Sequence, residues 1–296
     1  MTTSDALVTI GLPTYNGADR LERTILSVLG QDHPHLELVI SDNASTDGTE
    51  QLCRDFAASD PRIVYHRQPQ NVGAVANFTQ AMRMGRGEFF RWIGDDDWIA
   101  PNCVSRSLRA FAADERLVLV TAQTSYTSEG RTHTARYEGA ALGSDDPAER
   151  FAEMLRLLTE SYAVIDPLYG MQRRSVGAAI PRPVLVREDE LAAARYALAG
   201  PWAHVNEVLS HRNWLKARPT RMSRRFQLPA WRGYFANILL SRELLRALDE
   251  AGLTSDQRRR ARAAVLRSYV ARQRLVVRRG GRKLTRLASA IVTGRS

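Results

Sequence analysis

The chain contains the stretch Leu36-Glu37-Leu38-Val39-Ile40-Ser41-Asp42-Asn43-Ala44-Ser45-Thr46-Asp47-Gly48-Thr49. Its first five residues are typical of a buried β-strand, and the polar loop after them leads into a helical pattern that continues to about Ser59. The chain begins in the same way, because an apolar run over Leu7 to Gly11 and a turn at Pro13 to Gly17 precede an amphipathic helix. Two successive strand–turn–helix units predict parallel strands joined by crossover helices.

This alternation continues with strands expected at Ile63 to His66 and Glu88 to Ile93, and a helix from Ala74 to Met84 between them. The predicted fold is therefore α/β, with a mostly parallel twisted sheet and helices on both faces. Ligands of such sheets bind beyond the carboxyl ends of the strands, near a topological switch point. Asp42 and Asp95 to Asp97 follow the second and fourth strands, so we expect them at one rim of the sheet.

The second half of the chain has a less regular pattern. From Tyr234 onward it is helical, and Gly280-Gly281 is expected to break the last helix. Further strands are expected over Val118 to Ser125, Ile165 to Gln172 and Ala203 to Leu209, and further helices over Asn102 to Ala112, Pro147 to Thr159 and Glu188 to Leu198.

Composition places the chain among folded proteins, because 44% of its 296 residues are hydrophobic and 25% are charged. The formal net charge of +10 is not spread evenly. Residues 255–296 hold 13 Arg and Lys against one acid, so this tail carries +12 and the rest of the chain about −2. The main body therefore need not bind a polyanion.

The basic tail alternates Arg with Leu and Val at near-helical spacing, which favours adsorption to an anionic lipid surface. A solvated charged helix is the alternative, and nucleic-acid binding is disfavoured because no aromatic residues are interleaved. No apolar window of 18 residues and no N-terminal targeting pattern occur. We therefore expect a cytoplasmic protein, peripheral at the inner face of the cytoplasmic membrane, with Cys53 and Cys103 reduced and buried.

Three consecutive carboxylates, Asp95, Asp96 and Asp97, follow the fourth strand. Like charges this close repel one another unless a cation neutralises them. Mg²⁺ or Mn²⁺ would use one or two of these carboxylates and complete its shell with phosphate oxygens and water. The alternative is a solvated acidic turn or a helix N-cap, because Pro101 and a predicted helix follow closely.

Two other acidic segments also have ordinary structural explanations. Asp47 is well explained as a helix cap, whereas Asp42 lies at the strand end, several residues before the helix, and is explained less well. Arg187-Glu188-Asp189-Glu190 begins a predicted helix, where acids complement the helix dipole. Neither segment alone decides between structure and function.

Taken together, four motifs occur in order: Val8 to Gly17, Val39 to Thr49, Asn71 to Gly73 and Gly94 to Pro101. They resemble the N-terminal half of the family 2 inverting glycosyltransferases of the GT-A fold. The resemblance covers about the first 115 residues strongly and continues more weakly to about Arg212. It implies a GT-A domain over residues 1–230, with a nucleotide-binding half (1–115) and an acceptor-binding half (116–230), before a helical, Arg-rich extension (231–296).

The resemblance also implies an activity. Such an enzyme transfers a hexosyl or deoxyhexosyl group from a nucleotide-diphosphate sugar to an acceptor hydroxyl with inversion, and depends on Mg²⁺ or Mn²⁺. The expected acceptor belongs to a cell-envelope glycan, a glycolipid or a related glycoconjugate.

Site residues follow from the family's motifs. Asp189 matches the general base, with Glu188 as its partner, and Asp97 matches the metal ligand of an Asp-x-Asp element, although Gly94 stands where many relatives have another Asp. His204, His211 and Arg212 lie in a segment that runs near the donor diphosphate in relatives, and His211 and Arg212 are the candidate contacts. The candidate donor-binding residues are Pro13, Thr14, Tyr15, Asp42, Asn71, Asp95 and Asp96.

Two other functions remain open. A nucleotidyltransferase that makes nucleotide sugars shares a nucleotide-binding α/β half, but it needs a Gly-rich, basic loop after the first strand, where this chain has Pro13 to Gly17. A non-catalytic nucleotide-sugar-binding module is weakened by the intact set of acids. The donor sugar, its nucleotide, the acceptor and the oligomeric state are not encoded in any recognisable pattern.

Overall fold

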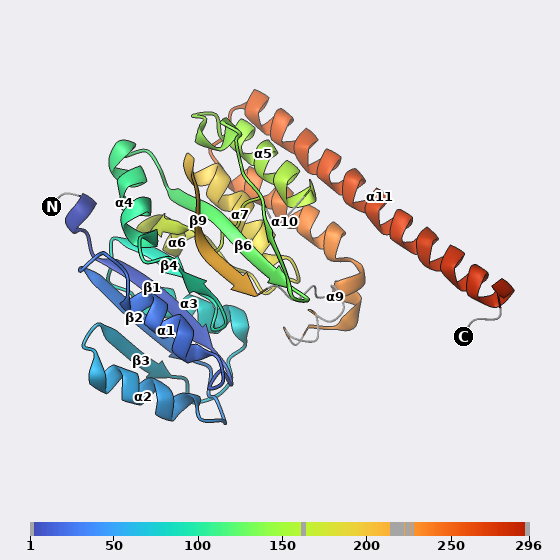
Figure 1. The fold of residues 1–296 in the computed structure, drawn as a ribbon. Coiled ribbons are helices and arrows are strands. Elements are labelled where there is room, and N and C mark those ends of the chain that lie inside the picture. Colours follow the sequence, from blue (N-terminus) through green and yellow to red (C-terminus); the bar gives the residue numbers. More distant parts are fainter. Residues whose placement is uncertain (1–2, 161–163, 214–221, 223–225, 227, 294–296) are drawn as a thin grey trace.

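The computed structural model describes residues 3–160, 164–213, 222, 226 and 228–293. Its centre is a nine-stranded sheet in the order β3-β2-β1-β4-β8-β6-β9-β5, with β7 paired to β6 (Figure 1). The strands are β1 (Val8–Thr14), β2 (Leu36–Asp42), β3 (Ile63–Arg67), β4 (Phe89–Trp92), β5 (Trp98–Ile99), β6 (Leu119–Ser128), β7 (Arg131–Thr134), β8 (Met171–Arg173) and β9 (Trp202–Asn213).

Most neighbouring strands are parallel. β1 pairs in parallel with β2 and with β4, β2 with β3, and β6 with β9. The short strand β8 is antiparallel to both β4 and β6, so β6 and β9 run in the same direction as β1 and β4. The carboxyl ends of β1, β2, β4, β6 and β9 therefore meet at one edge of the sheet, as the alternating pattern predicts.

Helices cover both faces of the sheet. Ile10 and Leu12 face a core that contains Ile25 of α1 and Phe111 of α4. On the other face, a Cβ at Gly11 would lie 2.4 Å from the Phe90 ring, so only glycine lets this layer close. The helices are η1 (Thr3–Asp5), α1 (Leu21–Leu29), α2 (Thr49–Ser59), α3 (Ala74–Met84), α4 (Cys103–Ala113), η2 (Ala141–Gly143), α5 (Pro147–Glu160), α6 (Arg174–Ala179), α7 (Glu188–Ala199), α9 (Ala230–Tyr234), α10 (Ala236–Glu250) and α11 (Ser255–Thr293).

The C-terminal helices share a core with the second half of the domain. Phe151 of α5, Leu191 of α7, Leu244 of α10 and Val265 of α11 belong to one buried cluster. Figure 1 shows α11 crossing α5 and then extending away from the rest of the fold. No helix in the described residues is both long and apolar enough to span a membrane. Cys53 and Cys103 are buried and free, as expected.

Two details of the sequence prediction are wrong. The strand expected over Ile165 to Gln172 is limited to β8, because the Gly170 amide donates to the Pro167 carbonyl at 3.2 Å and closes a turn there. The break expected at Gly280-Gly281 does not occur, and α11 is continuous through both residues. Each glycine costs a helix about 1 kcal/mol but keeps its N–H donor, so the hydrogen-bond ladder can continue.

Candidate functional site

The end of β1 and the loop after β4 are joined by hydrogen bonds at the carboxyl edge of the sheet. The Asp95 carboxylate accepts a hydrogen bond from Thr14 Oγ1 at 3.0 Å and pairs with Arg20 Nη2 at 2.8 Å. Thr14 and Pro13 are buried, whereas the neighbouring Tyr15 side chain is exposed at the rim. The first predicted motif and the acidic triplet therefore lie together.

Asp42 is fully buried and organises the loop after β2. Its Oδ1 accepts hydrogen bonds from the Ser45 amide at 2.9 Å and the Ser45 hydroxyl at 2.5 Å, while its Oδ2 accepts one from Tyr65 Oη at 2.8 Å. Arg67 Nε lies 3.9 Å from the same Oδ2. Tyr65 and Arg67 were not predicted as site residues, because β3 carries no polar motif and its polar side chains meet Asp42 only through the register of β2 and β3.

Asp47 precedes Gly48, the N-cap residue of α2, and is not itself the cap, but it does bind the first amide of that helix. Its Oδ1 accepts a hydrogen bond from the amide of Thr49, the first residue of α2, at 3.0 Å. Its Oδ2 accepts another from the Ala18 amide at 3.2 Å, which fastens the loop after β1 to the loop after β2.

Asn71 belongs to an amide pair beside this loop. Asn43 Nδ2 donates to Asn71 Oδ1 at 3.0 Å, and the Val72 amide donates to Asn43 Oδ1 at 2.9 Å. The buried Asn77 on α3 exchanges hydrogen bonds with Ser41, whose hydroxyl donates to Asn77 Oδ1 at 2.8 Å. These amides hold the third motif against the end of β2.

Asp97 is only 3% exposed and is held by the end of β9. Arg212 Nε donates to Asp97 Oδ2 at 2.8 Å, and the Asn213 amide donates to Asp97 Oδ1 at 3.2 Å. The guanidinium of Arg212 also pairs with Asp166 and lies 3.7 Å from the centroid of the Tyr169 ring. The helix-cap interpretation of the triplet does not hold, because α4 begins without a side-chain cap.

Asp96 lies between these two engaged acids and makes no ion pair with any described residue. Desolvation, together with the charges of Asp97 and Asp95, raises the pKa of Asp96 to about 6. An added positive charge would relieve this repulsion. The described residues hold no group of three or more His, Cys, Asp and Glu side chains around a common metal position. Hard carboxylate oxygens on one short loop nevertheless fit a divalent cation that takes one or two protein ligands and shares phosphate oxygens.

Asp189 lies in the first turn of α7, between two acids that are already neutralised. Glu188 pairs with Arg182, whose Nη2 lies 2.7 Å from Glu188 Oε2, and Glu190 pairs with Arg187. The Asp189 side chain is accessible to solvent at this end of α7, between the buried Glu188 and Glu190. Desolvation, followed by the charges of Glu190 and Glu188, raises the pKa of Asp189 to about 7. Asp189 is therefore suited to exchange a proton near neutral pH.

His211 of β9 stacks on Trp98 of the neighbouring strand β5. Its ring lies parallel to Trp98, with the two centroids 4.9 Å apart and an angle of 1° between the planes. The guanidinium carbon of Arg23 lies 3.2 Å from the centroid of the Trp98 ring. Burial and the charge of Arg23 lower the pKa of His211, which keeps its imidazole neutral at pH 7.

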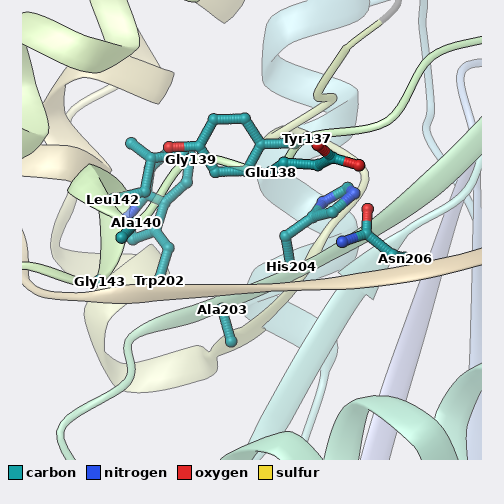
Figure 2. Close-up of a pocket in the computed structure, with 10 residues that line it drawn as sticks. All are labelled: Tyr137, Glu138, Gly139, Ala140, Leu142, Gly143, Trp202, Ala203, His204 and Asn206. Carbon is teal, nitrogen blue, oxygen red and sulfur yellow. The ribbon is translucent and has the colours of Figure 1, made fainter.

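His204, at the other end of β9, lines a separate pocket of about 280 Å³ with Tyr137, Glu138, Trp202 and Asn206 (Figure 2). Thr121 Oγ1 lies 3.0 Å from His204 Nδ1, and burial lowers the pKa of His204 to about 4. β9 bulges between the two residues, because His204 pairs with Thr121 of β6 and Arg212 pairs with Tyr126. The five residues of β6 between these partners correspond to roughly 17 Å at 3.3 Å per residue. His204 therefore does not belong to the acidic site.

The fold thus brings Thr14, Asp95, Asp96, Asp97 and Arg212 to one edge. Asp166 extends this group toward α7, because its negative charge contributes to the raised pKa of Asp189. The arrangement offers carboxylates for a hard cation, a guanidinium for an anion and one proton acceptor. Asp166, Arg20 and Asn213 were not predicted, because each lies in a loop or at a strand end with no motif around it.

Comparison with known proteins places the chain beside one family. A family model described as Glycosyl transferase family 2 matches residues 9–176, which is more than half of the chain. TuaG of Bacillus subtilis (strain 168), named for teichuronic acid biosynthesis, is 36% identical over 97 residues, or 33% of this chain and 38% of TuaG. WcaA of Escherichia coli (strain K12), named for colanic acid biosynthesis, is 37% identical over 102 residues, or 34% of this chain and 37% of WcaA. The matched segments thus span less than two-fifths of either relative.

Solved structures confirm the predicted GT-A fold. S. aureus TarS 1-349, solved in complex with UDP-GlcNAc, superposes with a TM-score of 0.68 at 18% identity, over 89% of this chain and 72% of that chain. The mannosyltransferase PcManGT from Pyrobaculum calidifontis, solved with GDP-Man and Mn²⁺, superposes with a TM-score of 0.54 at 16% identity, over 90% of this chain and 86% of that chain.

The charge repulsion at Asp96 predicts a pH-dependent gain of stability in Asp96→Asn. The fold raises the pKa of Asp96 from 3.8 to about 6, so the folded state binds the proton more tightly than the unfolded state. Wild-type stability should therefore fall as the pH rises from about 4 through 6, and the neutral variant should not lose this part. In metal-free buffer at pH 7.5, we expect Asp96→Asn to be more stable by about 1–3 kcal/mol in urea unfolding.

At pH 4 the difference between the variant and the wild type should largely disappear. Asp55→Asn, on the exposed face of α2, is the matched control and should be neutral at both pH values. Equal or lower stability of Asp96→Asn at pH 7.5 would show that Asp96 is not under electrostatic strain.

Proposed function

The chain belongs to glycosyl transferase family 2, and we propose that it transfers a sugar from a nucleotide-diphosphate donor to an acceptor hydroxyl, with inversion at the anomeric carbon. The observation that carries this proposal is the convergence of Asp95 to Asp97 and Arg212 at one edge of the GT-A sheet, with Asp166 close enough to both Arg212 and Asp189 to act on their charges. This edge supplies both of the functions that the reaction needs: charge stabilisation of a departing diphosphate and a base for a hydroxyl proton.

We assign the donor nucleotide to the loops after β1 and β2. Pro13, Thr14 and Tyr15 would contact the nucleoside, with the exposed Tyr15 ring available at the rim. Asp42 already accepts hydrogen bonds from Ser45 and Tyr65, so it would act on the base through the loop that it shapes or through a remaining lone pair. Asn71 would close the same pocket from the side of α3.

The acidic triplet would bind the ribose and the cation. Asp95 and Asp96 are proposed on the ribose side and Asp97 at the metal, where Mg²⁺ or Mn²⁺ would neutralise charge on the leaving diphosphate. Arg212 pairs with Asp97, and we propose that its guanidinium contacts the donor diphosphate. His211, neutral and stacked on Trp98, is proposed as a second contact from the same strand.

Asp189 is the proposed general base. Its carboxylate would accept the acceptor's hydroxyl proton while the hydroxyl oxygen forms a bond to the anomeric carbon. The bond from that carbon to the diphosphate oxygen breaks in the same step, and the nucleoside diphosphate leaves with the electron pair. Because attack comes from the face opposite the leaving group, the anomeric configuration is inverted.

Residues 1–230 are proposed as the catalytic domain, with 1–115 binding the donor and 116–230 the acceptor. A cell-envelope glycan or related glycoconjugate is the proposed acceptor class, supported by relatives named for teichuronic acid and colanic acid biosynthesis. The extension 231–296 is proposed to hold the enzyme on the inner face of the cytoplasmic membrane. Exposed Arg274 and Arg278 and exposed Val276 and Val277 on α11 support adsorption to an anionic bilayer.

Donor binding tests the function directly. We expect one of UDP, dTDP and GDP to bind in calorimetry with Mn²⁺ and to lose at least tenfold in affinity without the metal or in Asp97→Ala, because Asp97 would hold the cation that neutralises the diphosphate charge. Asp55→Ala, outside the site, should bind like the wild type. The proposal fails if no nucleotide shows metal-dependent binding.

The pH dependence tests the base. Because the pKa of Asp189 is about 7 and only the deprotonated form accepts a proton, kcat should rise with pH through about 7 and level above 8. Asp189→Asn should lower kcat by about 10²- to 10⁴-fold and leave nucleotide affinity unchanged. A transfer rate in Asp189→Asn near that of the wild type would contradict this assignment.

Membrane adsorption is measured by flotation with vesicles. Vesicles with 30% anionic lipid should carry the full chain, and Arg274→Ala/Arg278→Ala should weaken binding by roughly 30-fold, since each arginine contributes about 1 kcal/mol. The control Arg109→Ala/Arg131→Ala removes two exposed arginines of the catalytic domain and should have no effect. Equal binding to neutral vesicles would refute an electrostatic contact.

A further inference from the structure

The C-terminal helix α11 reaches the first turn of α7 through one buried arginine. The side chain of Arg272 is only 8% exposed, and its Nη2 lies 2.6 Å from Glu190 Oε2. Arg272 Nε donates to Ser268 Oγ at 3.2 Å, and that hydroxyl lies 2.9 Å from Thr159 Oγ1 on α5. The guanidinium is thus fixed by two helices before it meets Glu190.

Glu190 needs this positive charge because its side chain is only 2% exposed. A buried carboxylate without a cation costs several kcal/mol and would either protonate or disturb its neighbours. Arg187, from the same end of α7, also pairs with Glu190. Glu190 thus contacts two arginines: Arg187, which directly precedes α7, and Arg272, which lies 82 positions after Glu190 in the chain.

Glu190 is the strongest of the charges that act on Asp189. Among the residues that the structure describes, the charged groups around Asp189 include Glu188 and Glu190 on α7, Arg182 and Arg187 just before it, Asp166 before β8 with its partner Arg212, and Arg272 on α11. Arg182 neutralises Glu188, and Arg187 and Arg272 neutralise Glu190. Without Arg272, more of the negative field of Glu190 would reach Asp189.

We propose that Arg272 is a positioning residue for the transfer reaction, which compensates the buried Glu190 so that the neighbouring Asp189 is ionised and ready to accept the acceptor's proton. This inference rests on the proposed function of Asp189. It makes α11, which lies outside the family match over residues 9–176, a working part of the catalytic centre.

The test compares pH profiles of kcat for four variants of the full chain. Arg272→Met should move the acid-side midpoint upward by at least half a pH unit, so that kcat falls about threefold at pH 6 and stays close to the wild type at pH 9. Glu190→Gln should move the midpoint downward, because it removes the charge that opposes ionisation of Asp189. Arg272→Lys keeps the charge and should retain the wild-type profile, and Arg272→Met/Glu190→Gln should return toward it.

A purely structural role of Arg272 would lower Tm or raise KM without moving the midpoint. An unchanged midpoint in a folded Arg272→Met or in Glu190→Gln overturns the proposal, and if Arg272→Met does not fold, Glu190→Gln and Arg272→Lys decide the question. Failure of the proposed function is distinguishable from this outcome, since the wild type would then show no transfer, or Asp189→Asn would retain it.

Discussion

The ion pair between Asp97 and Arg212 is the contact on which the candidate site depends. It joins the loop after β4 to the C-terminal end of β9, and the two paired residues are 115 positions apart in the chain. Because Arg212 also pairs with Asp166, one guanidinium connects the loop after β4 to the segment that precedes β8. Asp97 is only 3% exposed, so without Arg212 its carboxylate would be buried with no cation beside it.

Charge compensation explains the other half of the site in the same way. Three acids of the site are held in place by ion pairs with arginines: Asp95 with Arg20, Glu188 with Arg182 and Glu190 with Arg187. Asp96 and Asp189 have no such partner among the described ion pairs, and their pKa values are raised to about 6 and about 7. Burial also raises the pKa of Asp97, although its partner Arg212 acts in the opposite direction. Asp95, Glu188 and Glu190 thus help to hold the framework through ion pairs, whereas Asp96 and Asp189 form no ion pair with a described residue.

The sequence was sufficient to predict the fold and to select the acidic residues of the candidate site. It did not predict most of the side chains that pair with those acids. The apolar runs before Asp42 and Asp95 predicted parallel strands, and strand direction alone brought their polar ends to one edge. Arg20, Tyr65 and Asp166 could not be predicted, because an ion pair between distant segments leaves no periodic trace. Gly280-Gly281 was misinterpreted for a related reason, since a local propensity of about 1 kcal/mol does not decide the end of a long helix.

Because α11 is unbroken, its length sets the distance between Arg272 and the C-terminal end of the helix. Its 39 residues correspond to about 58 Å, and the 21 that follow Arg272 correspond to about 32 Å. One part of this rod is anchored beside Asp189 and the other extends away from the fold (Figure 1). A surface that binds the C-terminal end of α11 would therefore fix the distance between that surface and the carboxyl edge of the sheet. It would also fix the orientation of that edge.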